Sequence, residues 1–234
     1  MAEKIKYTRK DLKGPDEFIT TLGRATEWGR RNRGKAIAAV TAAVLLLGGS
    51  LGMRAYLTWQ ESKASRDLWP HLNRARELLQ APGAADPEKL VQLEQFLTAY
   101  ANLHPGRKAT VFARYYLGSI AYLQGNYDLS AVQFRAAMGG LPAGGESLMD
   151  YLVRLGLAQA LEANGDLPGA LAGYRDASAH STGEMRTQPW MGEARVLSSM
   201  GKQAESIERY RSILRENPDS PMREVIEIRL SRAG

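Results

Sequence analysis

The chain has 234 residues, of which 44% are hydrophobic, so it can form one or two domains with a packed core and is not a disordered polymer. It contains no cysteine, which excludes disulfides, thiolate zinc sites and cysteine nucleophiles. The net charge of +6 is concentrated in residues 1–35, which hold ten Lys and Arg against five Asp and Glu. A nucleic-acid-binding protein would usually spread its basic charge over a folded face, so no nucleic-acid partner is expected.

Residues 1–35 form a polar, basic tail. The first 13 residues show no periodicity and are expected to be disordered. The motif Gly14-Pro15-Asp16-Glu17 is typical of a helix start, because proline occupies the first position and acids the first turn. The apolar residues that follow share one helical face: Phe18, Ile19, Leu22 and Ala25. This pattern predicts a short amphipathic helix on the inner leaflet, with a docking segment for a cytosolic partner and a solvated tail as alternatives.

The next feature is an apolar run, from Ala36 to Met53, of 18 residues without a charge. As a helix it would span roughly 27 Å, close to the thickness of the hydrocarbon core of a bilayer. Tyr56 and Trp59 follow where an interfacial aromatic belt is expected, and Arg54 can extend to the interface. The run therefore predicts a transmembrane helix over 36–57. A cleaved signal peptide and a buried core helix are the alternatives.

The charges beside this run predict its orientation. Basic residues gather on its N-terminal side, at Arg24, Arg30, Arg31, Arg33 and Lys35. The positive-inside rule then places residues 1–35 in the cytoplasm and the C-terminal domain outside it. In a Gram-negative host this is a single-pass protein of the cell inner membrane with a periplasmic domain. Gly48 and Gly52 form a small-xxx-small pair and are candidates for transmembrane packing, either with a partner or in a homo-oligomer.

Helical repeats are predicted after the span. Residues 58–110 are expected to contain a connecting helix and a degenerate helix pair, formed by 70–80 and 87–103. Three glycines then recur at intervals of 40 and 36 residues, at Gly125, Gly165 and Gly201. Intervals of this size are typical of stacked helix pairs, in which a left-handed residue ends the first helix of each pair.

The residues around these glycines have the pattern of a known repeat. The first segment supplies Leu117, Gly118, Gly125, Tyr127, Ser130, Phe134, Ala137 and Pro142, and the second Leu157, Ala158, Gly165, Ala170, Tyr174 and Ala177. The third supplies Trp190, Ala194, Gly201, Ser206, Tyr210 and Pro218. This pattern resembles the tetratricopeptide repeat. The resemblance implies an all-α fold, a helical repeat solenoid of three units over 111–144, 151–184 and 187–220, ended by a capping helix over 221–234 with a charged outer face.

The order of the segments resembles a more specific family. A short tail comes first, then one span written Lys-Ala-Ile-Ala…Gly-Met-Arg-Ala-Tyr, then a degenerate repeat domain. This arrangement resembles the YfgM-like ancillary subunits of the SecYEG translocon. The resemblance implies protein partners, namely translocon subunits, a periplasmic chaperone and exported polypeptides.

No catalytic, cofactor-binding or metal-binding motif is found, and the protein is not expected to be an enzyme. The three histidines, His71, His104 and His180, lie far apart and lack the spacing of metal ligands. The chain also lacks the GxSxG, Walker and GxGxxG motifs. Acids such as Glu88 and Glu94 fall between the apolar positions of a predicted helix, where solvation explains them.

The candidate binding surface is instead a groove lined by the first helix of each repeat. The expected lining residues are Tyr115, Ser119, Tyr122, Leu155, Gln159, Glu162, Met191, Arg195 and Ser198. This mixture suits an extended polypeptide or a helix of a partner. The alternative is that Tyr115, Leu155 and Met191 are simply packed between repeats.

Three functions are compatible with these predictions. The first is a membrane-anchored interaction module beside the translocon, which passes exported polypeptides to periplasmic chaperones. The second is an envelope scaffold that coordinates cell-wall or division machinery. The third is a cytoplasm-facing signalling adaptor, which requires the reversed topology.

Overall fold

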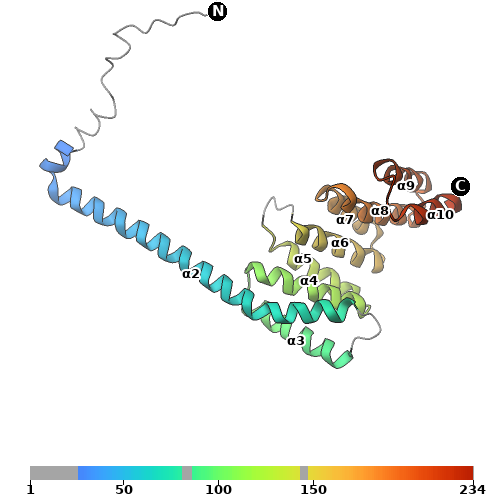
Figure 1. The fold of residues 1–234 in the computed structure, drawn as a ribbon, viewed down its shortest axis with the longest axis horizontal. Coiled ribbons are helices and arrows are strands. Elements are labelled where there is room, and N and C mark those ends of the chain that lie inside the picture. The colour runs from blue at the N-terminus through green and yellow to red at the C-terminus, as the bar shows by residue number, and fades with distance from the viewer. Residues whose placement is uncertain (1–25, 81–85, 143–146, 234) are drawn as a thin grey trace, which may run out of the picture. The chain divides into compact units, whose positions relative to one another are not determined.

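The computed structural model describes residues 26–80, 86–142 and 147–233, and all the regular elements in these ranges are helical (Figure 1). This confirms the predicted all-α fold class. The chain divides into two compact units, residues 1–59 and 60–234, which are treated separately below. The amphipathic helix predicted from Gly14 lies outside the described residues as far as residue 25.

The first unit is dominated by the N-terminal part of helix α2 (Arg33–Gln80). This helix is long and apolar enough to cross a membrane, and none of its most apolar 18-residue window is buried in the protein. Leu45, Leu46 and Leu51 have 65% or more of their surface exposed. The helix therefore has the composition of a membrane span or a signal sequence, whereas the buried core helix considered as an alternative would be covered by other residues.

Helix α2 continues into the second unit without a break at Pro70. The sequence places a helix start at this proline, and the structure instead contains it inside α2. Pro70 cannot donate a backbone hydrogen bond to the carbonyl of Arg66. Because both residues are exposed, water can satisfy that carbonyl, and the helix tolerates the proline.

The second unit is a succession of helix pairs. Its helices after α2 are α3 (Pro87–Leu103), α4 (Lys108–Leu123), α5 (Tyr127–Met138), α6 (Leu148–Ala163), α7 (Leu167–Ala179), α8 (Thr187–Ser199), α9 (Gln203–Glu216) and α10 (Arg223–Ala233), with a short 3₁₀ turn over Gly183–Arg186. Asn126, Ser147 and Asp166 cap α5, α6 and α7, each accepting a hydrogen bond from the backbone N–H three residues later.

The turn glycines have the conformation that their spacing predicts. Gly125, Gly165 and Gly201 follow the first helices of their pairs, α4, α6 and α8, with φ of 76°, 82° and 78°. This left-handed region disfavours residues that carry a Cβ. The three turns therefore have nearly the same geometry, as repeated units require.

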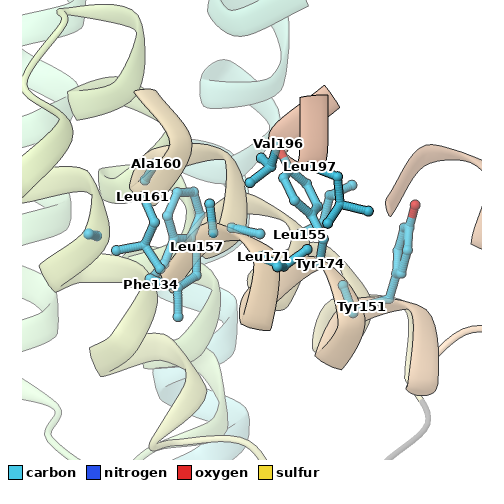
Figure 2. Packing of buried hydrophobic residues seen from close by; sticks show 14 residues of the cluster. Phe134, Tyr151, Leu155, Leu157, Ala160, Leu161, Leu171, Tyr174, Val196 and Leu197 are labelled. Carbon is cyan, nitrogen blue, oxygen red and sulfur yellow. The ribbon is translucent and has the colours of Figure 1, made fainter. Parts of the chain in front are cut away.

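Aromatic side chains from the second helix of a pair, Phe134 and Tyr174 in Figure 2, fill gaps above glycines in the first helices. A Cβ added to Gly118 would lie 3.0 Å from the Phe134 ring, and one added to Gly156 would lie 2.5 Å from it. Tyr174 occupies the same kind of gap above Gly192, at 2.4 Å. Phe134 therefore contacts helices of its own pair and of the next pair, which couples neighbouring units.

Small hydroxyl residues support the same close approach. Ser130 donates a hydrogen bond to the carbonyl of Gly118 at 2.8 Å, and Ser206 donates one to the carbonyl of Ala194 at 2.7 Å. Both serines are fully buried, so the bonds satisfy polar atoms that have no access to water. In each bond, the serine lies twelve positions after the residue whose carbonyl it contacts. The same contact therefore occurs in two different helix pairs, as a repeated unit requires.

Helix α10 covers the end of the stack. Ile226 is fully buried against a cluster that contains Trp190, Tyr210 and Ile213. The exposed residues of this helix include Arg223, Glu224, Glu227 and Arg229, and Val225 and Ile228 are 40% and 44% exposed among them.

Candidate functional site: the inner groove

Two adjoining hollows lie on the face formed by the first helices of successive pairs. The larger has a volume of about 650 Å³ and the smaller about 350 Å³. They share Leu79, Tyr115 and Leu152, so they form one continuous surface, which we call the inner groove. A volume of this size is in the range of ligand-binding clefts.

Helical periodicity explains which side chains reach the inner groove. The lining positions on each helix recur mainly at intervals of one, three or four residues, which places them on one side of the helix. They include Trp69, Leu72, Arg76 and Leu79 on α2, Lys108, Val111, Phe112, Tyr115, Tyr116, Ser119 and Tyr122 on α4, and Leu148, Leu152, Leu155 and Gln159 on α6.

Helix α4 lies against both neighbouring walls. Trp69 of α2 and Phe112 of α4 have ring centroids 6.4 Å apart. Glu61 of α2 accepts a hydrogen bond from the backbone N–H of Ala109 at 3.3 Å, which fixes the start of α4 against α2. The buried phenol of Tyr100, on α3, donates a hydrogen bond to the carbonyl of Ala64 at 2.9 Å, so the α2 wall is held from behind as well.

Much of the apolar lining is accessible. Trp69 and Leu148 are 51% and 64% exposed. Burial raises the pKa of the Tyr115 phenol, so that this side chain is neutral and adds an aromatic surface to the groove. Exposed aromatic and aliphatic residues beside a cleft are typical of a surface that binds another molecule.

Five of the nine residues predicted to line the groove lie in its smaller hollow: Tyr115, Ser119, Tyr122, Leu155 and Gln159. Leu155 is only 5% exposed, so it contributes mainly to the core. Arg195 and Ser198 line a separate hollow with Tyr210 and Arg229. Met191 lines a third, beside Met222. The structure therefore does not bring all nine residues to one surface, and their role in binding stays a prediction.

Glu162 and Arg195 separate these hollows. The Arg195 guanidinium donates two hydrogen bonds to the Glu162 carboxylate, at 2.5 and 2.6 Å, and thereby links α8 to α6. The phenol of Tyr174 donates a third bond to this carboxylate at 2.5 Å. Burial alone would raise the pKa of Glu162, but the hydrogen bonds from Arg195 and Tyr174 and the charge of Arg195 lower it. Glu162 is therefore ionised and engaged in a structural bridge.

The α2 wall of the inner groove is missing from the predicted set. Trp69, Arg76 and Leu79 precede the first complete repeat, so a pattern of repeat offsets does not reach them. Their spacing of seven and three residues on a helix is the signal that identifies a common face. The repeat offsets do not include Tyr116 and Leu152, which lie one residue after Tyr115 and three residues before Leu155.

The remaining polar clusters stabilise the fold. Glu193 is 1% exposed and accepts hydrogen bonds from Arg175 and Arg209, at 2.8 and 3.1 Å. Its burial is compensated by two guanidinium groups from α7 and α9. These contacts join three consecutive helices and leave the carboxylate inaccessible to a ligand.

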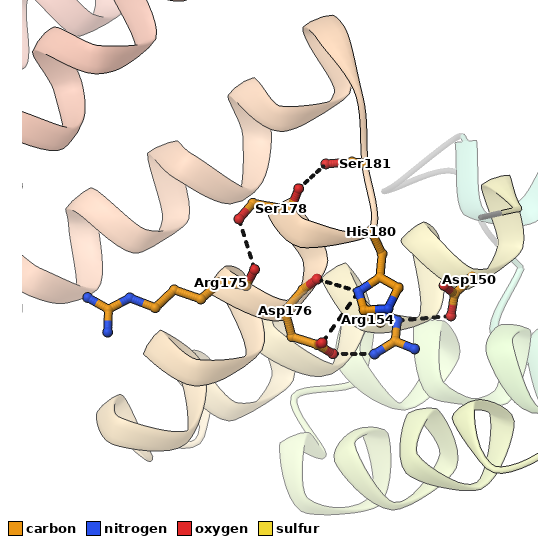
Figure 3. A network of polar contacts seen from close by, with 7 residues as sticks. All are labelled: Asp150, Arg154, Arg175, Asp176, Ser178, His180 and Ser181. Atoms are coloured by element: carbon orange, nitrogen blue, oxygen red, sulfur yellow. Dashed lines mark hydrogen bonds and ion pairs between the residues drawn. The ribbon is translucent and has the colours of Figure 1, made fainter. Parts of the chain in front are cut away.

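A second cluster joins α6 and α7 (Figure 3). Arg154 donates hydrogen bonds to Asp150, at 2.9 Å, and to Asp176. His180 lies 3.4 Å from the Asp176 carboxylate. In the described ranges, no group of three or more His, Asp or Glu side chains could hold a metal ion. His71 stacks on Phe96 with ring centroids 3.4 Å apart, and His104 lies against the ring of Tyr100 at 4.7 Å.

Comparisons with known proteins identify the fold. A crystal structure titled as a putative kinesin light chain with nearly identical TPR-like repeats, from Podosopora anserina, superposes with a TM-score of 0.60 at 16% identity. The alignment covers 73% of this chain and 86% of that one. A variant of that protein gives the same score and identity. No family model matches the chain, and no curated protein sequence matches it.

The chain therefore has a tetratricopeptide-like repeat fold. Stacked repeats of this kind form an extended concave surface.

Proposed function

We propose that this protein is a membrane-anchored interaction module that binds apolar polypeptide segments in its inner groove, outside the cytoplasm. The observation that carries the proposal is the accessible apolar groove of about 650 Å³ on a tetratricopeptide-like repeat. Exposed Trp69 and Leu148 at this groove need a covering partner to be removed from water.

The unburied apolar stretch of α2 supports the membrane anchor. Because no residue of its most apolar window is buried, lipid is the environment that suits it best. The basic residues before the span favour a cytoplasmic N-terminus. A signal sequence is the alternative, and its cleavage would release a soluble chain that lacks about the first fifty residues.

The finer proposal places this module beside the protein-export pore, where it receives exported polypeptides and passes them to periplasmic chaperones. A groove tethered at the membrane meets an emerging chain at high local concentration, so a modest affinity is sufficient. The physical support is the combination of an anchor with an apolar groove; the particular neighbours follow from the family resemblance of the sequence.

The first experiment tests the anchor. The full chain is expressed in a Gram-negative cell with a reporter fused after residue 234, and the membranes are extracted with alkaline carbonate. We expect the intact chain to stay in the membrane and the reporter to be active outside the cytoplasm. A soluble chain that lacks its first fifty residues would refute the anchor, and a reporter active only in the cytosol would favour a signalling adaptor.

The second experiment tests the partners. A photo-crosslinking amino acid is placed at Tyr116 or Tyr122 in the inner groove, at Gly52 in the span, and at exposed Val132 on α5 as a control. We expect exported polypeptides to be captured from the groove positions, translocon subunits from Gly52, and neither from Val132. Capture of cell-wall or division enzymes in their place would favour the envelope scaffold.

A further inference from the structure

The charged residues of the larger hollow in the inner groove all have the same sign. Arg76 of α2 and Lys108 of α4 line it, and no described acidic residue does. Both cations are exposed, and neither has an ion pair with any residue in the described ranges.

This arrangement combines an apolar wall with two positive charges that have no ion-pair partner among the described residues. Trp69, Phe112, Tyr116 and Leu152 provide the wall. A carboxylate placed near such a wall gains more from a cation than it would in open water, because the wall excludes solvent. A basic ligand would instead be repelled by both charges, so the groove distinguishes ligands by sign.

We propose that the inner groove selects apolar polypeptide segments that carry an acidic residue, with the carboxylate held by Arg76 and Lys108. This inference rests on the proposed function, because it specifies which segments the groove binds. It also predicts that purely apolar segments bind more weakly and that segments with Lys or Arg among their apolar residues are excluded.

An anionic lipid also combines apolar and acidic groups, but the rest of the groove favours a polypeptide. The smaller hollow continues the surface past Tyr122 and carries the amides of Gln159 and Gln188. These amides can hydrogen bond with a peptide backbone. An acyl chain would cover them without offering a partner, which is unfavourable.

The test is a peptide selection on the full chain in nanodiscs. A displayed library of random twelve-residue peptides is selected against the wild type and against two variants. Leu148→Glu adds an acid inside the groove at a position that is 64% exposed, and Val132→Glu adds one outside it at a position that is 54% exposed. Because both sites are exposed, both variants should fold, and circular dichroism checks this.

We expect the wild type and Val132→Glu to enrich peptides with apolar residues and an Asp or Glu, and Leu148→Glu to lose this enrichment. An enriched peptide and its copy with Gln for Glu are then titrated by fluorescence anisotropy. Arg76→Gln and Lys108→Gln should each weaken binding of the acidic peptide about two- to five-fold, which is the effect of losing an exposed ion pair. Neither change should alter the affinity for the Gln copy.

The outcomes separate the two proposals. Enrichment of apolar peptides with no preference for acids, still lost in Leu148→Glu, would overturn the acidic selectivity and retain the groove. Enrichment that Leu148→Glu does not affect, or no enrichment at all, would overturn both. A lipid retained in native mass spectrometry by the wild type and not by Leu148→Glu would assign the groove to lipid and overturn the polypeptide proposal.

Discussion

Replacing Gly156 by alanine tests whether the contact between Phe134 and the next helix pair holds the stack together. The added Cβ would lie 2.5 and 2.6 Å from two atoms of the Phe134 ring, closer than real side-chain contacts allow. Phe134 is 3% exposed and surrounded by the core, so its ring cannot move away freely. In an open helical position, the same change would stabilise the protein by about 1 kcal/mol.

The clash should outweigh that gain. Overpacking a core costs about 1–3 kcal/mol, so the net destabilisation expected for Gly156→Ala is about 1 kcal/mol. In a domain of this size, that lowers the melting temperature by about 2–4 °C. Thermal unfolding of the full chain in detergent, followed by far-ultraviolet circular dichroism, measures the shift.

Two further variants make the result specific. Gly139→Ala is the matched control, because its Cβ would meet only backbone carbonyls at 3.7 and 3.8 Å and its φ is −64°, so it should be neutral or stabilising. In a Phe134→Leu background, which removes the ring, Gly156→Ala should change sign and stabilise the protein. If Gly156→Ala stabilised the otherwise wild-type protein, the close packing of Phe134 on Gly156 would be refuted.

Three other changes should alter stability in predictable ways. Glu193→Gln should lower the free energy of unfolding in urea by about 1–3 kcal/mol, because a neutral amide would replace a buried carboxylate that is paired with two arginines. Exposed Glu224→Gln should have little effect. The folded-state pKa of Glu162 lies below its ordinary value of 4.5, so its contribution to stability is present above that pH and is lost as the pH falls. Glu162→Gln should therefore make the melting temperature less sensitive to acid. An unchanged dependence of the melting temperature on acid pH would contradict the bridge. Burial, reinforced by the charge of Glu61, raises the pKa of Tyr100 to about 12. Its contribution to stability is therefore present below about pH 10 and is lost towards about pH 12. Tyr100→Phe should lack this loss when the alkaline unfolding of the two proteins is compared.

The repeat fold could be predicted from local features. Each turn needs a residue in the left-handed conformation, and each close helix contact needs a small residue. The architecture could therefore be predicted from the spacing of Gly125, Gly165 and Gly201 and from the residues beside them. The composition of the apolar run similarly identifies a candidate span. These are properties of short segments, which a sequence shows without knowledge of the tertiary structure.

The candidate site was predictable only in part, because it depends on contacts between distant segments. The continuation of α2 through Pro70 depends on the exposure of that turn, which is a tertiary property. The bridge between Glu162 and Arg195 joins residues 33 positions apart, and Arg195 lines a hollow separate from the inner groove. Arg76 lies before the repeats, so its place beside Lys108 follows only from the stacking of α2 on α4.

The extent of the inner groove also limits how much of a partner the protein can hold. Its lining crosses three helices, α2, α4 and α6, and reaches α8 only at Gln188, whereas Arg195 lines a separate hollow. With interaxial distances of about 8–10 Å and helix diameters of about 10–12 Å, this surface is roughly 30 Å across, which corresponds to about nine residues of extended chain. Longer ligands would have to leave the surface at both ends, so recognition is confined to a short stretch of each partner.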